Sequence, residues 1–375
     1  MKKKRNKPNF FLNLSNEDNS PISEESYPYR FTTQNWTRIW FTTNPQEFLP
    51  QKNKIRIIDF LNTFPSRKIA LIFDSRLLDE HGKEDFAQFK HELSSLNKAN
   101  QINFYDFSEI SFQQNLFDEE LPLYELANIE LTHLANGGNV AAASDIVRTL
   151  SKVFCLGIYT DFDVEFLPSQ IEEFKTSSPF LFSVNGYNYC NDILAIHPKL
   201  TLKTELLKNY YKNILESYRL CREYNLEQRE QLQREMTLDL MGLFEDEHRR
   251  LVEPAMAQLF YIINEKYEEY SSLPMSLLIR KACEEAIKNE ENAHLKIIYK
   301  KIYMHNVMAS AGPKALPGGM SYDEERDCKK LRLLVRGQVD LLSNDGGWIP
   351  SILASDKQPQ KKDDQEKDES RTLQP

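Results

Sequence analysis

Apolar and polar residues alternate along this chain in two different ways. Between residues 36 and about 200, short apolar runs rich in β-branched and aromatic residues are separated by stretches with helical spacing, which is typical of an α/β sheet covered by helices. From residue 202 to 304 the pattern becomes almost wholly helical, with Pro254 and Pro274 as expected helix boundaries. The runs predicted as strands are Ile55–Ile58, Lys68–Phe73, Ile102–Phe107, Gly157–Thr160 and Leu181–Ser183.

The two patterns predict one α/β core that carries a large α-helical insertion, because strand-like residues return after the helices. No repeat of fixed period interrupts this order. Both ends of the chain are polar and rich in charge, which is typical of disordered segments. We therefore expect a flexible segment at 1–30, a core at 31–200, a helical insertion at 201–304, a return to the core at 305–354 and a disordered tail at 355–375.

The most informative local pattern joins a helix to a short strand. Residues 140–154 place apolar side chains on one helical stripe, and Gly157 offers a stop. The apolar residues that follow end at Asp161-Phe162-Asp163. Two carboxylates at a strand end are hard oxygen ligands for a divalent cation, and such an ion commonly meets a substrate diphosphate. Solvated turn residues are the alternative interpretation.

Asp145 and Arg148 lie three positions apart on the predicted helix, off its apolar stripe. They form an intrahelical ion pair in the simpler interpretation. In the alternative, an acceptor and a planar multi-donor stand side by side to bind sugar hydroxyls.

Longer stretches around these residues resemble a known family. Residues 138–148, Gly-Asn-Val-Ala-Ala-Ala-Ser-Asp-Ile-Val-Arg, and residues 159–164, Tyr-Thr-Asp-Phe-Asp-Val, resemble the catalytic segment of the large clostridial toxin glucosyltransferases and related bacterial effector glycosyltransferases. Residues 38–40 look like the opening strand of that family, and residues 69–75 look like its second strand and acidic turn. The resemblance spans roughly residues 36 to 200, and it implies a GT-A-like, Rossmann-like core that binds a nucleotide sugar.

The resemblance also implies roles for individual residues. Asp163 would be the direct ligand of Mn²⁺ or Mg²⁺, and Asp161 would hold the ion through water or bind the ribose hydroxyl. Asp145 and Arg148 would bind the sugar hydroxyls. The same resemblance places Ser144 and Tyr159 beside the ribose, Trp40 against the uracil ring and Asn191 near the anomeric carbon. Trp40 as a core aromatic and Asn191 as a turn residue are the alternatives.

The second half of the ion's coordination shell departs from the family pattern. Toxin-like relatives close the site with a late loop that carries an acidic residue, a Ser and a Trp. Here the candidate loop is residues 342–348, whose two glycines give it the freedom of a closing lid. His305 is a rival ligand, and residues 311–313, Ala-Gly-Pro, resemble a turn near the donor. The loop residues with expected roles are Trp348 as the lid aromatic and Ser343, Asn344 or Asp345 as an oxygen ligand.

The family resemblance implies a metal-dependent glycosyltransferase that moves a hexose from a UDP-sugar to a protein acceptor. Glucose and N-acetylglucosamine are the expected sugars, and retention of configuration is implied. Two alternatives come from other classes. The chain could be an inactive scaffold that acts as a binding protein, since fold does not guarantee activity. It could be an aspartyl-phosphate phosphatase, although Glu165 stands where such enzymes need Thr or Val.

Composition narrows the classes without naming one. The 375 residues are 41% hydrophobic, which suffices for a real core. A net charge of -9 argues against a protein that binds nucleic-acid backbones. The five cysteines lie far apart and show no metal-binding spacing, so we expect reduced, mostly buried thiols and a protein that works in a cytosol.

The ends of the chain carry expectations about localisation. No apolar window of about 18 residues predicts a membrane span. The basic start, residues 1–5, is followed by too short an apolar cluster for a secretory signal, and it would contact anionic lipid only weakly. The acidic cluster at 363–369 resembles carboxyl-terminal signals of effectors delivered by type IV secretion. We therefore expect a secreted effector that acts in a host cytoplasm on a host protein.

Overall fold

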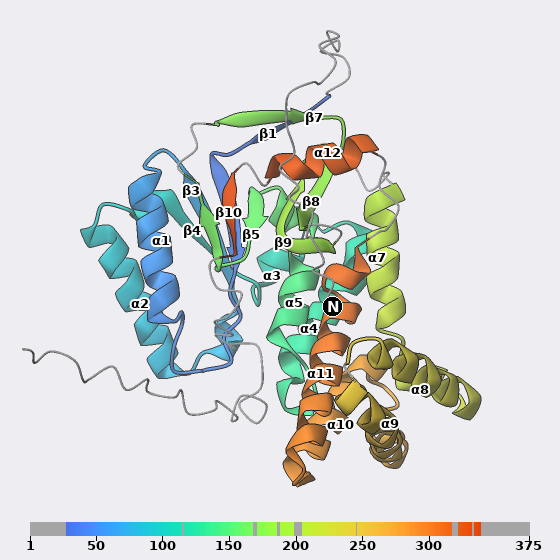
Figure 1. Ribbon diagram of the computed structural model, residues 1–375. Coiled ribbons are helices and arrows are strands. Elements are labelled where there is room, and N and C mark those ends of the chain that lie inside the picture. Colours follow the sequence, from blue (N-terminus) through green and yellow to red (C-terminus); the bar gives the residue numbers. More distant parts are fainter. Residues whose placement is uncertain are drawn as a thin grey trace, which may run out of the picture.

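A six-stranded mixed sheet forms the centre of the α/β part (Figure 1). The computed structural model describes residues 28–114, 116–167, 171–185, 188–198, 205–244, 246–316, 322–331 and 334–338. The strand order is β4-β3-β2-β5-β9-β8, in which the first four strands are parallel and β9 is antiparallel to both of its neighbours. The strands are β2 Asn35–Ile39, β3 Lys68–Phe73, β4 Ile102–Asp106, β5 Ile158–Thr160, β8 Phe180–Asn185 and β9 Asn188–Ile196.

Two small antiparallel pairs flank this sheet. β1 (Tyr29–Thr32) pairs with β7 (Glu173–Thr176). β6 (Val164–Phe166), which starts directly after the acidic turn, pairs with β10 (Val335–Gln338). The late part of the described chain therefore returns to the edge of the sheet where the acidic pair lies.

Helices surround the sheet and continue into a separate helical part. Figure 1 shows α1 and α2 together on one side, and α8 to α11 gathered below the sheet on the other. The helices of the α/β part are α1 Gln51–Thr63, α2 Glu80–Ser95, α3 Ile110–Gln113, α4 Leu121–Thr132, α5 Val140–Val147, α6 Ser151–Phe154 and α12 Tyr322–Leu331. The other helices are α7 Glu205–Ser217, α8 Leu226–Met241, α9 Asp246–Lys266, α10 Met275–Asn289 and α11 Ala293–Ser310.

Two apolar clusters hold these elements together. The first lies around the central sheet and includes residues of α7, and the second is formed mainly by α8 to α11. α5 packs between them, because Ala142 belongs to the helical cluster whereas the neighbouring Ala143 belongs to the sheet cluster. Both alanines are fully buried. The small side chains of the Ala-Ala-Ala segment thus let α5 approach both clusters.

Three local predictions were wrong. Residues 55–58 lie in α1 and not in a strand, because the residues buried from this segment follow a helical period. Pro254 lies inside α9, on its exposed side, so the carbonyl that loses its helical partner faces water. The helix predicted over 140–154 is two helices, because Leu150 adopts an extended backbone between them. Pro274 was predicted correctly, since it is the N-cap of α10.

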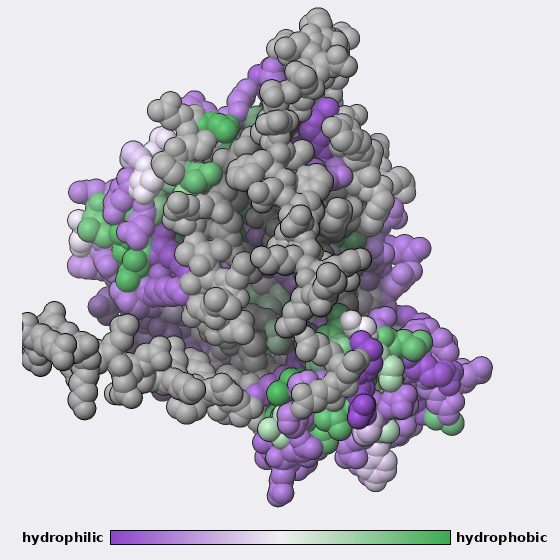
Figure 2. Space-filling view, in the orientation of Figure 1, coloured by the Kyte–Doolittle hydropathy of each residue, from purple (hydrophilic) through white to green (hydrophobic). Residues whose placement is uncertain are grey.

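The surface of the helical part mixes apolar and charged side chains (Figure 2). No helix among the described residues is long and apolar enough to cross a membrane. None of the five cysteines forms a disulfide bond within the described part of the chain, and Cys221, Cys283 and Cys328 are buried whereas Cys155 is exposed. The expected tail at 355–375 lies outside the described residues, as does nearly all of the segment at 1–30.

Candidate active site

The predicted site lies where neighbouring strands of the central sheet end. β2 and β5 are parallel neighbours, so Trp40 and Asp161, which follow them, meet at the same edge. The backbone N–H of Asp161 donates to the carbonyl of Asp192 on β9 at 2.8 Å. This bond brings Asn191 and the acidic turn together. Gly157 makes the approach to β5 feasible, because at its φ of 155° a Cβ would lie 2.4 Å from the carbonyl oxygen of Asn35.

Helix α5 carries Ser144 and Asp145, and Arg148 directly follows it. Asn139 caps its start, and the side-chain oxygen accepts hydrogen bonds from the N–H groups of Ala141 and Ala142. The helix ends after Val147, and Arg148 is its C-cap. The cap explains the Asn at the start of the recognised motif.

Asp145, Arg148 and Asn191 form one hydrogen-bonded group. Arg148 Nη2 lies 2.7 Å from Asp145 Oδ1, and the Asn191 amide donates to the same oxygen at 3.0 Å. Arg148 Nη1 also donates to the carbonyl of Asn191 at 2.6 Å. All three residues are buried. Asp145 and Arg148 therefore do form an intrahelical ion pair, but a buried one that is tied to β9.

The same guanidinium reaches the acidic turn. Arg148 Nη2 lies 3.4 Å from Asp161 Oδ1, and its Cζ lies 4.2 Å from the centre of the Tyr159 ring. The Tyr159 hydroxyl donates to Asp161, and Arg148 Nη2 donates to the Ser144 hydroxyl at 3.4 Å. One side chain thus links the predicted residues on α5, β5 and β9.

Burial raises the pKa of the acidic groups in this network. It raises the pKa of Asp145, against the effect of Arg148 and of the Asn191 hydrogen bond. Burial and the charges of Asp163 and Asp192 raise the pKa of Asp161 to about 7, although Arg148 and the Tyr159 hydroxyl act in the opposite direction. Burial lowers the pKa of Arg148, but Asp145, Tyr159 and Asp161 more than reverse this. The ionised form of Asp161 is therefore disfavoured in this setting, and a bound cation would favour it.

These properties fit a divalent cation at the acidic turn. Asp161 keeps 33% of its side chain exposed and Asp163 is half-buried, so hard oxygen atoms remain reachable. Within the described part of the chain, no group of three or more His, Cys, Asp or Glu side chains has a metal-binding arrangement. His305 lies half-buried within α11. The expected loop residues Ser343, Asn344, Asp345 and Trp348 lie outside the described residues.

Trp40 lies at the rim of the site and is half-buried. Its ring meets the Phe162 ring edge-on, with 5.5 Å between the centroids and 81° between the planes. Its indole N–H is buried and finds no acceptor among the residues that the structure describes. The structure thus brings Trp40, Ser144, Asp145, Arg148, Tyr159, Asp161, Asp163 and Asn191 into one region.

Two residues of this region, Tyr210 and Phe162, were not assigned a role from the sequence. The Tyr210 hydroxyl on α7 donates to the carbonyl of Ala311 at 3.2 Å, and burial raises the pKa of this tyrosine, with Asp145 adding to the effect. At Gly312 a Cβ would lie 3.1 Å from Asp145 Oδ2, so the Ala-Gly-Pro turn does pass the site. For Phe162 no signal was present in the sequence beyond its position between the two aspartates. Tyr210 had no signal beyond its helical stripe.

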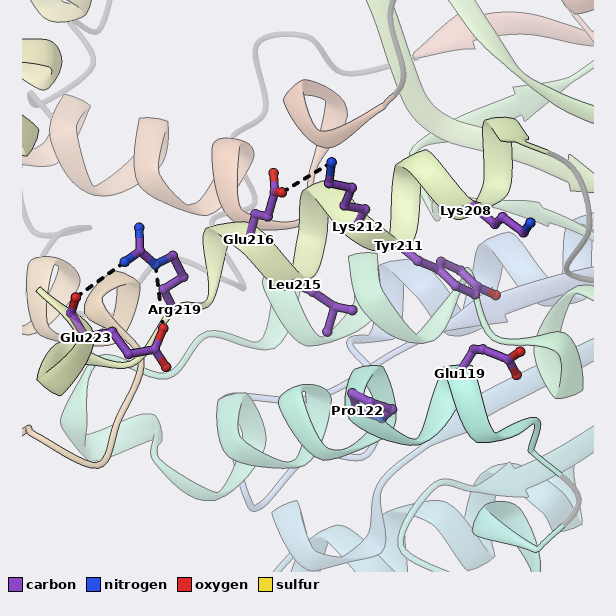
Figure 3. Close-up of a pocket in the computed structure, with 9 residues that line it drawn as sticks. All are labelled: Glu119, Pro122, Lys208, Tyr211, Lys212, Leu215, Glu216, Arg219 and Glu223. Carbon is purple, nitrogen blue, oxygen red and sulfur yellow. Dashed lines mark hydrogen bonds and ion pairs between the residues drawn. The ribbon is translucent and has the colours of Figure 1, made fainter.

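A groove of 620 Å³ lies outside this region, between the start of α4 and the outer face of α7 (Figure 3). None of its lining residues was predicted as a site residue. The ion pair between Lys212 and Glu216 lies on α7 beside the groove, and the ion pair between Arg219 and Glu223 lies just after that helix. Tyr211 connects it to the site only indirectly, because its hydroxyl donates to the carbonyl of Thr149 at 2.8 Å.

Comparison with known proteins identifies the chemistry. Residues 22–188 match the model of glycosyltransferase family 88, a span that contains the acidic turn and all of α5. The chain is a glycosyltransferase. The matched residues of this glycosyltransferase include Asp145, Arg148, Asp161 and Asp163.

Solved structures with a resemblance to this glycosyltransferase include the following three. The PaToxG glycosyltransferase is 15% identical, with 82% of this chain and 87% of that one covered and a TM-score of 0.36. The UDP-bound glycosyltransferase domain of the YGT toxin is 11% identical, with 81% and 79% covered and a TM-score of 0.40. The catalytic domain of the alpha-toxin from Clostridium novyi is 13% identical, with 88% and 78% covered and a TM-score of 0.38. No curated protein matches the chain.

Proposed function

We propose that this glycosyltransferase moves a hexose from a UDP-sugar to a protein acceptor with the help of a divalent cation. The observation that carries the proposal is the position of Arg148, whose Nη2 lies 2.7 Å from Asp145 Oδ1 and 3.4 Å from Asp161 Oδ1. A sugar-binding pair and an ion-binding pair are thereby held at one edge of the sheet. Both lie in the segment that matches family 88.

Asp145 and Arg148 bind the donor sugar in this proposal. Asp145 accepts hydrogen bonds from sugar hydroxyls, and its buried carboxylate is already oriented by Arg148 and Asn191. Because the orientation exists before the donor arrives, little free energy is lost in ordering the site. In this proposal Asn191 lies near the anomeric carbon, as the family resemblance implies.

The leaving diphosphate lies at Asp161 and Asp163. A bound Mn²⁺ or Mg²⁺ supplies Lewis-acid neutralisation of the diphosphate there. Asp163 would bind the ion directly, and Asp161 would bind it through water or bind the ribose. Tyr159 and Ser144 orient Asp161 and Arg148 through their hydroxyls, and Trp40 offers a flat ring to the uracil.

The donor, the acceptor and the location complete the proposal. UDP-glucose and UDP-N-acetylglucosamine are the proposed donors, and the configuration is retained by front-face attack, as the family resemblance implies. The acceptor is a host protein, reached by a type IV-like secreted effector in the host cytoplasm. The acidic cluster at 363–369 supports this route.

Incubation with single UDP-sugars and Mn²⁺, followed by an assay of free UDP, tests the donor and the ion. We expect release of UDP from one of the two donors, loss of that release with a chelator, and loss in the variant with both Asp161→Asn and Asp163→Asn. The control Asp239→Asn, on the exposed side of α8, should be as active as the wild type. Absence of release with every UDP-sugar would support the inactive-scaffold alternative instead. Sugar found by mass spectrometry on a host lysate protein then names the acceptor.

A further inference from the structure

A buried arginine lies beneath the acidic turn and is not explained by the proposed reaction. Arg38, on β2, is 2% exposed. Its Nη1 has no hydrogen-bond partner among the described residues, and it forms no ion pair within that part of the chain. Burial lowers the pKa of Arg38 to about 10, which leaves the guanidinium charged at neutral pH. The charges of Asp161 and Asp163 partly offset the cost of burying this cation, whereas the charge of Arg56 adds to it, and a further contact helps to stabilise it.

Aromatic rings provide that contact. Arg38 Cζ lies 4.9 Å from the centre of the Phe162 ring, 5.6 Å from Phe166 and 6.0 Å from Phe60. These are distances at which a cation is attracted to the face of a ring. Phe162 is the nearest of the three, and it is the middle residue of the acidic turn. It is itself 8% exposed.

Phe162 also contacts Trp40. The edge-on geometry of these two rings, with centroids 5.5 Å apart, is a favourable aromatic arrangement. Arg38 lies on β2, and Trp40 directly follows the last residue of that strand. Phe162 therefore contacts both, and its two chain neighbours are the carboxylates Asp161 and Asp163.

We infer that Arg38, Phe162 and Trp40 form a packed unit that couples the base-binding ring to the ion-binding turn. A cation held by Asp161 and Asp163 fixes Phe162, and Phe162 in turn fixes the Trp40 ring in its binding position. By reciprocity, a base on Trp40 tightens the binding of the cation. The three are positioning residues, and the inference rests on the proposed function.

Uridine makes this coupling measurable, because it lacks the diphosphate and so cannot contact the cation through phosphate oxygens. The quantity to measure by calorimetry is the ratio of uridine affinities with Mn²⁺ and with a chelator. For the wild type we expect Mn²⁺ to tighten uridine binding about fivefold or more, the lower end of usual coupling between sites. Phe162→Leu and Arg38→Met should bring the ratio close to one, whereas Arg38→Lys should restore most of it.

Phe166→Leu is the matched control, since it removes a ring from Arg38 but leaves the contact between Phe162 and Trp40. It should keep the wild-type ratio, and the melting temperature of every variant identifies any that does not fold. A wild-type ratio of one, or an unchanged ratio in both Phe162→Leu and Arg38→Met, overturns the inference. Failure of UDP itself to bind the wild type with Mn²⁺ would instead overturn the proposed function, and the inference with it.

Discussion

The carboxylate of Glu130 and the guanidinium of Arg280 lie 2.5 Å apart, and both side chains are fully buried. Glu130 is on α4 in the α/β part, and Arg280 is on α10 in the helical part. The other oxygen of Glu130 accepts a 2.7 Å hydrogen bond from the backbone N–H of Asn139, which caps α5. The pair therefore connects the helical part to the helix that carries Asp145 and Arg148.

We predict that Arg280→Met destabilises the protein by about 3–5 kcal/mol, because it leaves the Glu130 charge buried without its partner. Adding Glu130→Gln should recover part of the loss, since the uncompensated charge is removed. Denaturant unfolding measures both. The control Lys281→Met removes a half-exposed lysine on the same helix and should cost less than about 1 kcal/mol. Equal losses for the two helix positions would contradict a special role for the pair.

The raised pKa of Asp161 predicts how stability depends on pH without metal. Because the pKa is about 7 in the folded protein, the fold retains a proton that the unfolded chain loses near its ordinary pKa of 3.8. Ionisation of this group therefore reduces folding stability as the pH rises from about 4 to 7, and the reduction levels off above that. In a chelator, the melting temperature of Asp161→Asn should fall less between pH 5 and pH 8 than that of the wild type. Parallel curves would argue against the raised pKa.

One methyl group added at Gly312 should disturb the site and lower both stability and activity. In Gly312→Ala the new Cβ would lie 2.8 Å from the carbonyl oxygen of Met308 and 3.1 Å from Asp145 Oδ2. We expect a loss of about 1–3 kcal/mol in stability and about a tenfold or larger fall in UDP release, since Asp145 must shift. Gly242→Ala is the control. There the nearest atom is 3.4 Å away and φ is -70°, so a gain of about 0.4–1 kcal/mol with full activity is expected.

Asn191→Ala should show whether Asn191 supports turnover by orienting Asp145 or only by stabilising the fold. The variant loses the 3.0 Å hydrogen bond to Asp145 Oδ1, so we expect UDP release to fall about 10- to 100-fold. Asn213→Ala loses a bond of the same length to the carbonyl of Ala315, away from the carboxylates. It should lower stability by a similar amount, about 1 kcal/mol, yet keep its turnover. Rates and melting temperatures of both variants give the comparison, and equal losses of turnover would show that Asn191 acts only through stability.

Much of the α/β part was predictable from the sequence, because its strands are short apolar runs between turns. Lys68–Phe73 forms β3 with the predicted bounds, and Ile102–Asp106 forms β4 one residue shorter than expected. The run at 55–58 failed because four residues fit a strand as well as one helical turn, and tertiary packing decided between them. Pro254 failed because packing of its buried neighbours outweighs the lost helical hydrogen bond.

The proximity of the candidate site residues was also predictable, since it follows from strand ends and from one motif. Their partners were not. Asn139, Asp145 and Arg148 lie in one motif, but Glu130 and Arg280 meet across 150 positions of sequence. Arg38 gave no signal either, because the sequence does not show which rings surround it. Long-range contacts of this kind depend on how the layers pack, and no local pattern encodes them.

The pairing of β6 with β10 gives the acidic turn a dependence on the far end of the polypeptide. Val164, the residue that directly follows Asp163, lies opposite Gln338. A ribosome-bound chain, or one clipped by a protease before residue 335, could assemble the six-stranded sheet while the backbone behind the carboxylates still lacked its neighbour. We therefore expect sugar transfer only from chains that have been synthesised past β10, and no transfer from shorter chains.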